Sequence, residues 1–73
     1  MQIVTREPRS IAATVRRLRA EREWNQRQLA EAAGLSKRTV EWIEGGKRGA
    51  QMSTYGRIAR ALGVPITELL GEE

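Results

Sequence analysis

The chain has 73 residues, which gives room for one domain with one modest hydrophobic core. It contains no cysteine and no histidine, so disulfide bonds, cysteine-based metal sites and ordinary zinc sites are excluded. Thirteen Lys and Arg residues stand against nine acidic residues, all of them Glu, and the resulting net charge of +4 favours a polyanionic partner.

A first amphipathic helix is predicted over residues 10 to about 23. Ile11, Val15 and Leu18 recur at the spacing of one helical face. Ser10 directly precedes this pattern and is the expected N-cap. Arg16 and Arg17 fall on the outward side of this helix. Their side chains either form a solvated face or contact a DNA backbone.

The residues before this helix have no obvious place in a core. We therefore expect residues 1–9 to be a flexible N-terminal segment and residues 10–71 to be the folded domain. Residues 2–5 have mild β-propensity, which is compatible with disorder or with an edge strand added to a partner.

The second helix is predicted to begin at Asn25. Asn25 and Gln28 have the spacing of a capping box, and Trp24 with Leu29 fits a hydrophobic staple. Gly34 is the expected end of this helix, in the left-handed conformation that glycine adopts easily.

Only Gly34 and Leu35 separate this end from the next predicted start at Ser36. Because so short a connector forces two helices to pack at a steep angle, the pattern predicts a helix-turn-helix. The third helix covers residues 36 to about 44. A fourth over residues 52–62, stopped by Gly63, and a last short one over residues 66–70 complete an all-α fold of five short helices.

A helical wheel of the third helix, at 100° per residue, separates an inward side from an outward side. Val40 and Ile43 define the inward side, and Glu44 falls beside Val40. A carboxylate in that place needs a cationic partner, because an unpaired buried charge costs several kcal/mol. Arg19, near the end of the first helix, is our candidate for that partner.

The outward side of the third helix carries Arg38 at its centre, with Trp42 close to it and Lys37 and Glu41 on the shoulders. Groups suited to phosphate lie on both sides of this face. Gln26 is in the first turn of the second helix, where free N–H groups attract anions, and residues 45–49 offer two cations on an unhindered backbone. A helix placed between two phosphate-binding elements is what docking in a DNA groove requires.

The stretch WNQRQLAEAAGLSKRTVEWIEGGKRGAQMSTYGRIARALGVPITELL resembles the DNA-binding domain of the phage lambda-type repressor and Cro family, the XRE class of bacterial regulators. The matching pieces are NQRQLAEAAGLS, TVEWIEGGKR and IARALGVPITELL, and the likeness covers residues 11 to about 70. The resemblance implies a lambda-repressor-like fold of five helices, with the helix-turn-helix at helices 2 and 3.

The resemblance also implies a role for each matching position. Positions that face base edges are matched by Lys37, Arg38 and Trp42, with Glu41 as a less frequent contributor. Positions at the sugar-phosphate backbone are matched by Gln26, Ser36, Thr39, Lys47 and Arg48. Arg19 and Glu44 match a buried ion pair that joins the first and third helices, a structural feature rather than a functional one.

Trp42 departs from the pattern, because the family commonly has a polar side chain there. Three interpretations remain for it: contact with a sugar or a thymine methyl group, packing in a protein interface or against Arg38, and a tolerated surface aromatic. Ala50 and Gln51 also depart, since they replace the frequent Pro-Ser before the fourth helix.

The leading functional hypothesis is a transcriptional regulator, a repressor, that binds a palindromic operator in double-stranded DNA as a homodimer. The last helix is the expected dimer surface, because Ile66, Leu69 and Leu70 exceed what a short terminal turn should bury in its own core. Small Cro-like proteins and restriction-modification controllers both have this layout. Without His, Cys or Asp, no acid–base pair or activated nucleophile is predicted, and neither a metal nor a cofactor is expected.

The alternative hypothesis is a protein-interaction module, such as the antitoxin of a toxin–antitoxin pair, that docks a partner through Trp42 or the N-terminal segment. Neither a signal peptide nor a run of about 20 apolar residues is present, so we expect a cytoplasmic protein. The start at Met1 and the charged end favour a complete small protein over a fragment of a longer regulator.

Overall fold

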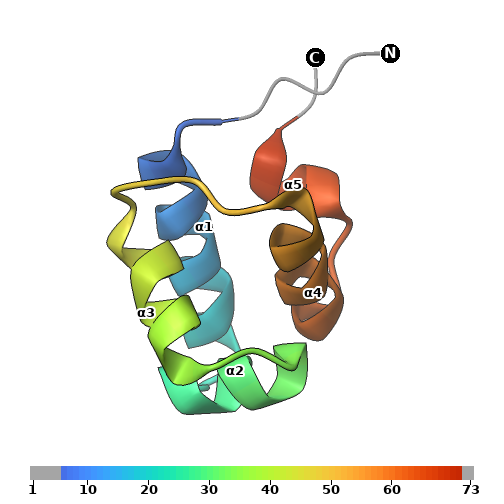
Figure 1. Ribbon diagram of the computed structural model, residues 1–73. Coiled ribbons are helices and arrows are strands. Elements are labelled where there is room, and N and C mark those ends of the chain that lie inside the picture. Colours follow the sequence, from blue (N-terminus) through green and yellow to red (C-terminus); the bar gives the residue numbers. More distant parts are fainter. Residues whose placement is uncertain (1–5, 72–73) are drawn as a thin grey trace.

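Five helices make up the part of the chain that the computed structural model describes, residues 6–71 (Figure 1). They are α1 (Pro8–Glu21), α2 (Gln26–Ala33), α3 (Lys37–Gly45), α4 (Met52–Leu62) and α5 (Ile66–Leu70). The predicted all-α class with five short helices is confirmed. Within residues 6–71, no helix combines the length and the apolar character needed to cross a membrane.

Helix α1 is the central support of the fold. It packs against α3 on one side and against α4 and α5 on the other, while α2 contacts both α3 and α4 (Figure 1). The core between them is made of aliphatic side chains and one tyrosine. Its fully enclosed large members are Ile11, Val15, Leu29, Val40, Ile58, Leu62, Leu69 and Leu70. Each helix contributes to this list, so all five share one core.

The start of α1 differs from the prediction. The helix begins at Pro8, and its N-cap residue is Glu7, so the expected N-cap at Ser10 is wrong. Ser10 lies inside the first turn, where its carbonyl accepts a hydrogen bond from the Thr14 hydroxyl at 3.1 Å. Proline suits the first helical position, because it lacks an N–H that would have no partner there and its fixed φ matches the helix.

The segment before α1 is tied to the end of the chain. The Arg6 backbone N–H donates to the Leu70 carbonyl at 2.8 Å, and its guanidinium donates to the Glu68 carbonyl at 3.0 Å. Arg6 is thus bonded to the helical domain and α1 already begins at Pro8, ahead of the predicted domain start at residue 10. The edge strand suggested for residues 2–5 lies outside the described residues.

The predicted helix boundaries around the turn are confirmed. The Asn25 side chain accepts from the Gln28 N–H at 2.8 Å, and the Gln28 side chain accepts from the Asn25 N–H at 2.7 Å, which completes the capping box. Gly34 ends α2 in the left-handed conformation, with φ of 69°. Ser36 caps α3 by accepting from the Thr39 N–H at 3.1 Å.

The two leucines of α5 complete the core of the single chain. Leu69 and Leu70 are each 0% exposed, because α5 packs against both α1 and α4. The expectation that their side chains form a dimer surface is wrong, since the core has room for both. Ile66 is partly buried and packs on the same core.

Candidate nucleic-acid interface

The inward side of α3 is locked to α1 by a buried ion pair. Glu44 is 4% exposed, and its two carboxylate oxygens accept from Arg19 Nε at 2.7 Å and Nη2 at 2.9 Å. The remaining Arg19 donor, Nη1, bonds the Trp24 carbonyl at 2.8 Å. The hydrogen bonds that Arg19 donates to Glu44 raise the pKa of Arg19 above its ordinary value, against the opposing effect of burial. The expected partner of Glu44 is therefore the one found.

Gln26 joins this ion pair from the start of α2. Its side-chain amide Nε2 donates to Glu44 Oε1 at 3.1 Å. The Glu44 carboxylate thus ties together the first three helices, and one amide hydrogen of Gln26 is engaged inside the protein. The sequence analysis predicts that Gln26 contacts a DNA phosphate. It does not predict the hydrogen bond from Gln26 to Glu44.

Arg16 and Arg17, two exposed arginines of α1, bond to different partners. Arg16 donates to the backbone carbonyl of Glu44, near the end of α3. Arg17 pairs with Glu21 at 3.0 Å, one turn further along the same helix, with both side chains more than half exposed. Arg16 is therefore a further link between α1 and α3, whereas Arg17 belongs to a solvated face.

The outward side of α3 presents cations and one aromatic ring. Lys37, Arg38, Glu41 and Trp42 are all exposed, as the wheel predicted. Lys37 Nζ lies 3.5 Å from Glu41 Oε2, one helical turn away, in a pair that is about half exposed. Because such solvated pairs are weak, Lys37 remains available to an anionic ligand.

Ser36 and Thr39 stand at the start of the same helix. Their hydroxyl oxygens lie 2.9 Å apart, and the Ser36 oxygen also caps the helix. The side chains predicted to contact phosphate are thus bonded to each other. Each hydroxyl keeps further capacity for a second hydrogen bond.

Trp42 has a cationic neighbour that the sequence did not predict. The Arg48 guanidinium carbon lies 5.3 Å from the centroid of the Trp42 ring, which is the geometry of a cation–π contact. Trp42 is 51% exposed, and the cation–π contact comes from Arg48, a residue not weighed as its neighbour in the sequence analysis. Arg48 lies in the loop after α3, so its position depends on the path of that loop.

The loop from α3 to α4 follows a defined path. Gly46 has φ of 71°, and a Cβ there would lie 3.1 Å from Arg9 Cα and 3.2 Å from Ala12 Cβ. Further along, the Ala50 N–H donates to the buried Tyr55 hydroxyl at 3.0 Å. This bond needs an N–H at residue 50, which alanine supplies and the family's frequent proline would lack.

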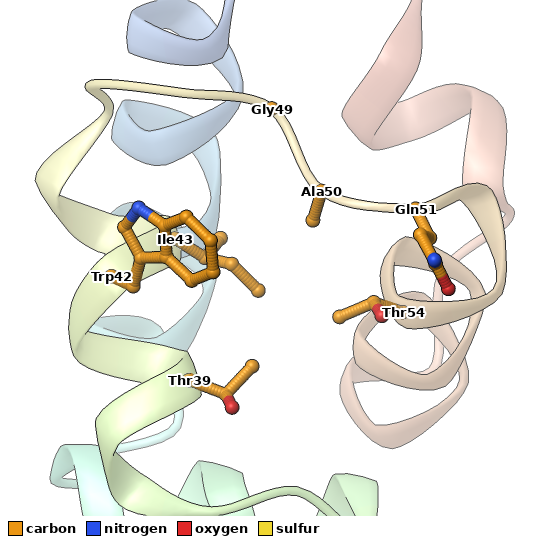
Figure 2. A pocket seen from close by; sticks show the side chains of 7 residues that line it. All are labelled: Thr39, Trp42, Ile43, Gly49, Ala50, Gln51 and Thr54. Atoms are coloured by element: carbon orange, nitrogen blue, oxygen red, sulfur yellow. The ribbon is translucent and has the colours of Figure 1, made fainter.

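A hollow of about 340 Å³ opens between α3 and the start of α4. Figure 2 shows Trp42 and Ile43 projecting from α3 toward Thr54 of α4 and toward Ala50 of the connecting loop. The residues that line it are Thr39, Trp42, Ile43, Gly49, Ala50, Gln51 and Thr54. We refer to it below as the α3–α4 hollow.

A second depression lies where α2 and α3 begin, lined by Asn25, Gln26, Arg27 and Lys37. It combines the free backbone N–H groups of a helix start with two cationic side chains, a pairing that suits a phosphate. Arg27 was not among the predicted site residues, although its place at the second position of α2 offered a signal. Residues 6–71 contain no cluster of acidic side chains that could hold a metal ion.

The structure thus brings the predicted DNA-contacting residues onto connected surfaces. Lys37 and Gln26 both line the depression where α2 and α3 begin. A further depression, next to the α3–α4 hollow, is lined by Arg38, Thr39, Trp42 and Arg48. Lys47 is exposed in the adjoining loop. An exposed cationic helix face between two such regions can bind an extended polyanion.

A family model described as a helix-turn-helix domain matches residues 10–70. Among curated relatives, the cryptic phage CTXphi transcriptional repressor RstR of Vibrio cholerae is 34% identical over 61 residues, which cover 84% of this chain and 55% of that protein. The immunity repressor protein of Bacillus phage phi105 is also 34% identical, over 64 residues that cover 88% of this chain and 44% of that protein. The chain thus spans about half the length of these relatives.

Solved structures agree with the fold. The restriction-modification controller protein C.AhdI from Aeromonas hydrophila superposes with a TM-score of 0.81 at 27% identity, covering 86% of this chain and 96% of that one. The hypothetical transcription factor NHTF from Neisseria gives a TM-score of 0.84 at 28% identity, covering 92% of this chain and 77% of that one.

Proposed function

The chain belongs to the helix-turn-helix domain family, and on that premise we propose that it is a transcriptional regulator that binds duplex DNA, with α3 as the recognition helix in the major groove. One observation carries this proposal. The outer face of α3 is exposed and cationic, while its inner face is fixed to α1 and α2 through the carboxylate of Glu44. A rigidly held helix with a free polar face is what base recognition in a groove requires.

The two regions beside α3 are suited to the DNA backbone. The start of α2, with Gln26 and Arg27, supplies backbone N–H groups and a cation, and the loop after α3 supplies Lys47 and Arg48. Contacts of this kind fix the orientation of a protein on a duplex, while side chains in the groove read the bases. In this arrangement Arg38 is the candidate for guanine, since its guanidinium matches the guanine major-groove edge.

We further propose that the regulator is a repressor that acts as a homodimer on a palindromic operator. A single recognition helix reads too few base pairs to select one site in a genome, whereas two helices about 34 Å apart read successive major grooves. The names of relatives such as the CTXphi and phi105 repressors support the repressor role. Because Leu69 and Leu70 are enclosed in the monomer, the dimer surface must use other residues.

Binding to DNA as a function of salt tests the proposal. We would measure the affinity of the wild-type chain for random duplex DNA, and for a duplex selected from a random pool, between 50 and 200 mM salt, the range over which phosphate contacts change affinity steeply. Each neutralised phosphate adds about 0.9 to the slope of log K against log salt. A wild-type chain that shows no binding at low salt, or binding without salt dependence, would contradict the proposal.

Variants separate base contacts from backbone contacts in the same assay. Lys47→Ala should weaken binding to both duplexes alike and reduce the slope by about 0.9. Arg38→Ala should chiefly reduce the preference for the selected duplex. Arg60→Ala, in the last turn of α4, is the matched control and should leave both quantities unchanged.

The alternative, a protein-interaction module, is favoured by Trp42 and Met52, the large apolar side chains that are exposed among residues 6–71. It predicts a chain that forms a complex with a second protein, with or without binding to duplex DNA. Light scattering at micromolar concentration tests the homodimer separately. If the chain is a monomer without DNA but two copies bind each selected duplex, the dimer forms on the operator.

A further inference from the structure

Trp42 is an unusual side chain for a cationic face. Trp42 is 51% exposed, and the charged side chains around it are Lys37, Arg38, Glu41 and Arg48, three of which are cationic. The Arg48 guanidinium carbon lies 5.3 Å from the ring centroid, so the indole has a cationic neighbour and remains half exposed. An exposed aromatic ring on a polar surface offers a contact to a ligand with an apolar group.

The α3–α4 hollow lies directly beside this ring. Ile43, Ala50 and the methyl-bearing side chains of Thr39 and Thr54 share its lining with Trp42, from both sides of the gap (Figure 2). Its shape is set by backbone elements that are held in place: the Tyr55 hydroxyl anchors the loop at Ala50, and α3 is fixed through Glu44. The hollow is thus preformed.

The charges around the hollow indicate which apolar group it accepts. Arg38 and Arg48 line the neighbouring depression that shares Thr39 and Trp42 with the hollow, so an occupant of the hollow lies beside two cationic side chains. DNA meets this requirement. Ile43, Ala50 and the Trp42 ring give the hollow an apolar side, and thymine is the base that presents an apolar group in the major groove, its 5-methyl.

We propose that Trp42 and the α3–α4 hollow together form a seat for the 5-methyl group of a thymine, so that Trp42 is a specificity-determining residue. The proposal rests on the DNA-binding function proposed above and adds to it the identity of one base. Arg38 and Trp42 then read different features: a polar guanine edge and an apolar thymine methyl group.

Replacement of thymine by uracil tests this directly, because the two bases differ only by the methyl group. In a duplex selected from a random pool, each thymine would be replaced by uracil in turn. One position should lower wild-type affinity about fourfold, as expected for one buried methyl-sized group. In Trp42→Ala the same replacement should change affinity by less than about 1.5-fold, while Met52→Ala, which removes another exposed apolar side chain, should keep the fourfold effect.

A photochemical measurement gives a second readout that does not depend on affinity. The thymine at the sensitive position would be replaced by 5-iodouracil, whose iodine occupies the place of the methyl group and crosslinks to an adjacent aromatic ring under ultraviolet light. The crosslink should map to Trp42 and not to Trp24, which is partly buried against the core.

The outcomes separate this inference from the proposed function. Salt-dependent, sequence-selective binding without any uracil-sensitive position would overturn the thymine seat and leave the DNA-binding function standing. A uracil effect of equal size in wild type and in Trp42→Ala, or a crosslink to another residue, would also overturn it. Absence of DNA binding in the salt titration would overturn both.

Discussion

Arg19 of α1 and Glu44 of α3 form a two-point ion pair, with Nε–Oε2 and Nη2–Oε1 distances of 2.7 and 2.9 Å. The pair lies at the inner side of the helix whose outer side carries Arg38 and Trp42. Since Gln26 donates to the same carboxylate, one side chain sets the position of α3 relative to both α1 and α2. The position of the surface proposed to bind DNA therefore depends on a carboxylate that is buried on the opposite side of α3.

Glu44→Gln should destabilise the fold, because it leaves the Arg19 charge without a counter-charge in a largely buried place. The Arg19 side chain is 20% exposed, so we expect a loss of about 2–4 kcal/mol in the free energy of unfolding, measured by urea denaturation. Glu21→Gln is the matched control, since it breaks an exposed pair with Arg17 and should cost at most about 0.5 kcal/mol. Equal losses in the two variants would contradict the structural role of Glu44.

Adjacent glycines after the recognition helix should respond in opposite directions to alanine. Gly46→Ala should cost about 2 kcal/mol, because Gly46 has positive φ and its new Cβ would crowd Arg9 and Ala12. Gly45→Ala should stabilise by about 0.5–1 kcal/mol, since Gly45 is helical and a Cβ there meets nothing within 4 Å. Thermal unfolding measures both changes in stability. A loss of stability in Gly45→Ala would contradict the helical conformation of Gly45, and a gain in Gly46→Ala would contradict the left-handed conformation of Gly46.

Tyr55→Phe should loosen the loop between α3 and α4. It removes the hydroxyl that accepts the Ala50 N–H, at an expected cost of about 1 kcal/mol. Hydrogen exchange at the Ala50 amide, followed by NMR, should become faster in the variant. Amides in the middle of α1 are the internal control, and the ranking of their exchange rates among the core amides should be the same as in wild type. An Ala50 amide that exchanges equally fast in wild type would mean that this bond does not hold the loop.

Leu69→Ala should lower stability by about 2–5 kcal/mol at every protein concentration, because Leu69 is enclosed within a single chain. Met52→Ala is the control, an exposed apolar residue whose removal should change stability by less than about 0.5 kcal/mol. A loss at Leu69 that shrank as wild type and variant were diluted would place the residue in a subunit interface.

Features set by neighbouring residues were predictable from the sequence. The capping box at Asn25, the cap at Ser36 and the ends of α2 and α4 at glycines depend on contacts within a few residues. The pairing of Glu44 with Arg19 was also predictable, because a helical wheel places the carboxylate inside, where a charge needs a partner. The start of α1 was missed although Pro8 marks the first helical position.

Features that depend on the path of a loop or on packing between distant segments were not predictable. The position of Arg48 over Trp42 follows from the loop after α3, which its local sequence does not fix. The burial of Leu69 and Leu70 follows from how α1 and α4 close around α5. The bond from Arg6 to Leu70 joins the two ends of the fold, and no local pattern predicts such a contact.

The central claim is that the outer face of α3, with its two flanking regions, is the surface that binds duplex DNA. The most direct measurement is an NMR titration of the ¹⁵N-labelled chain with a short duplex at low salt. Amide shifts should change at the start of α2, along the outer face of α3 and in residues 46–49, with little change in the last turn of α4 or in α5. Shift changes centred on α4 and α5, or none with an excess of DNA, would contradict the account.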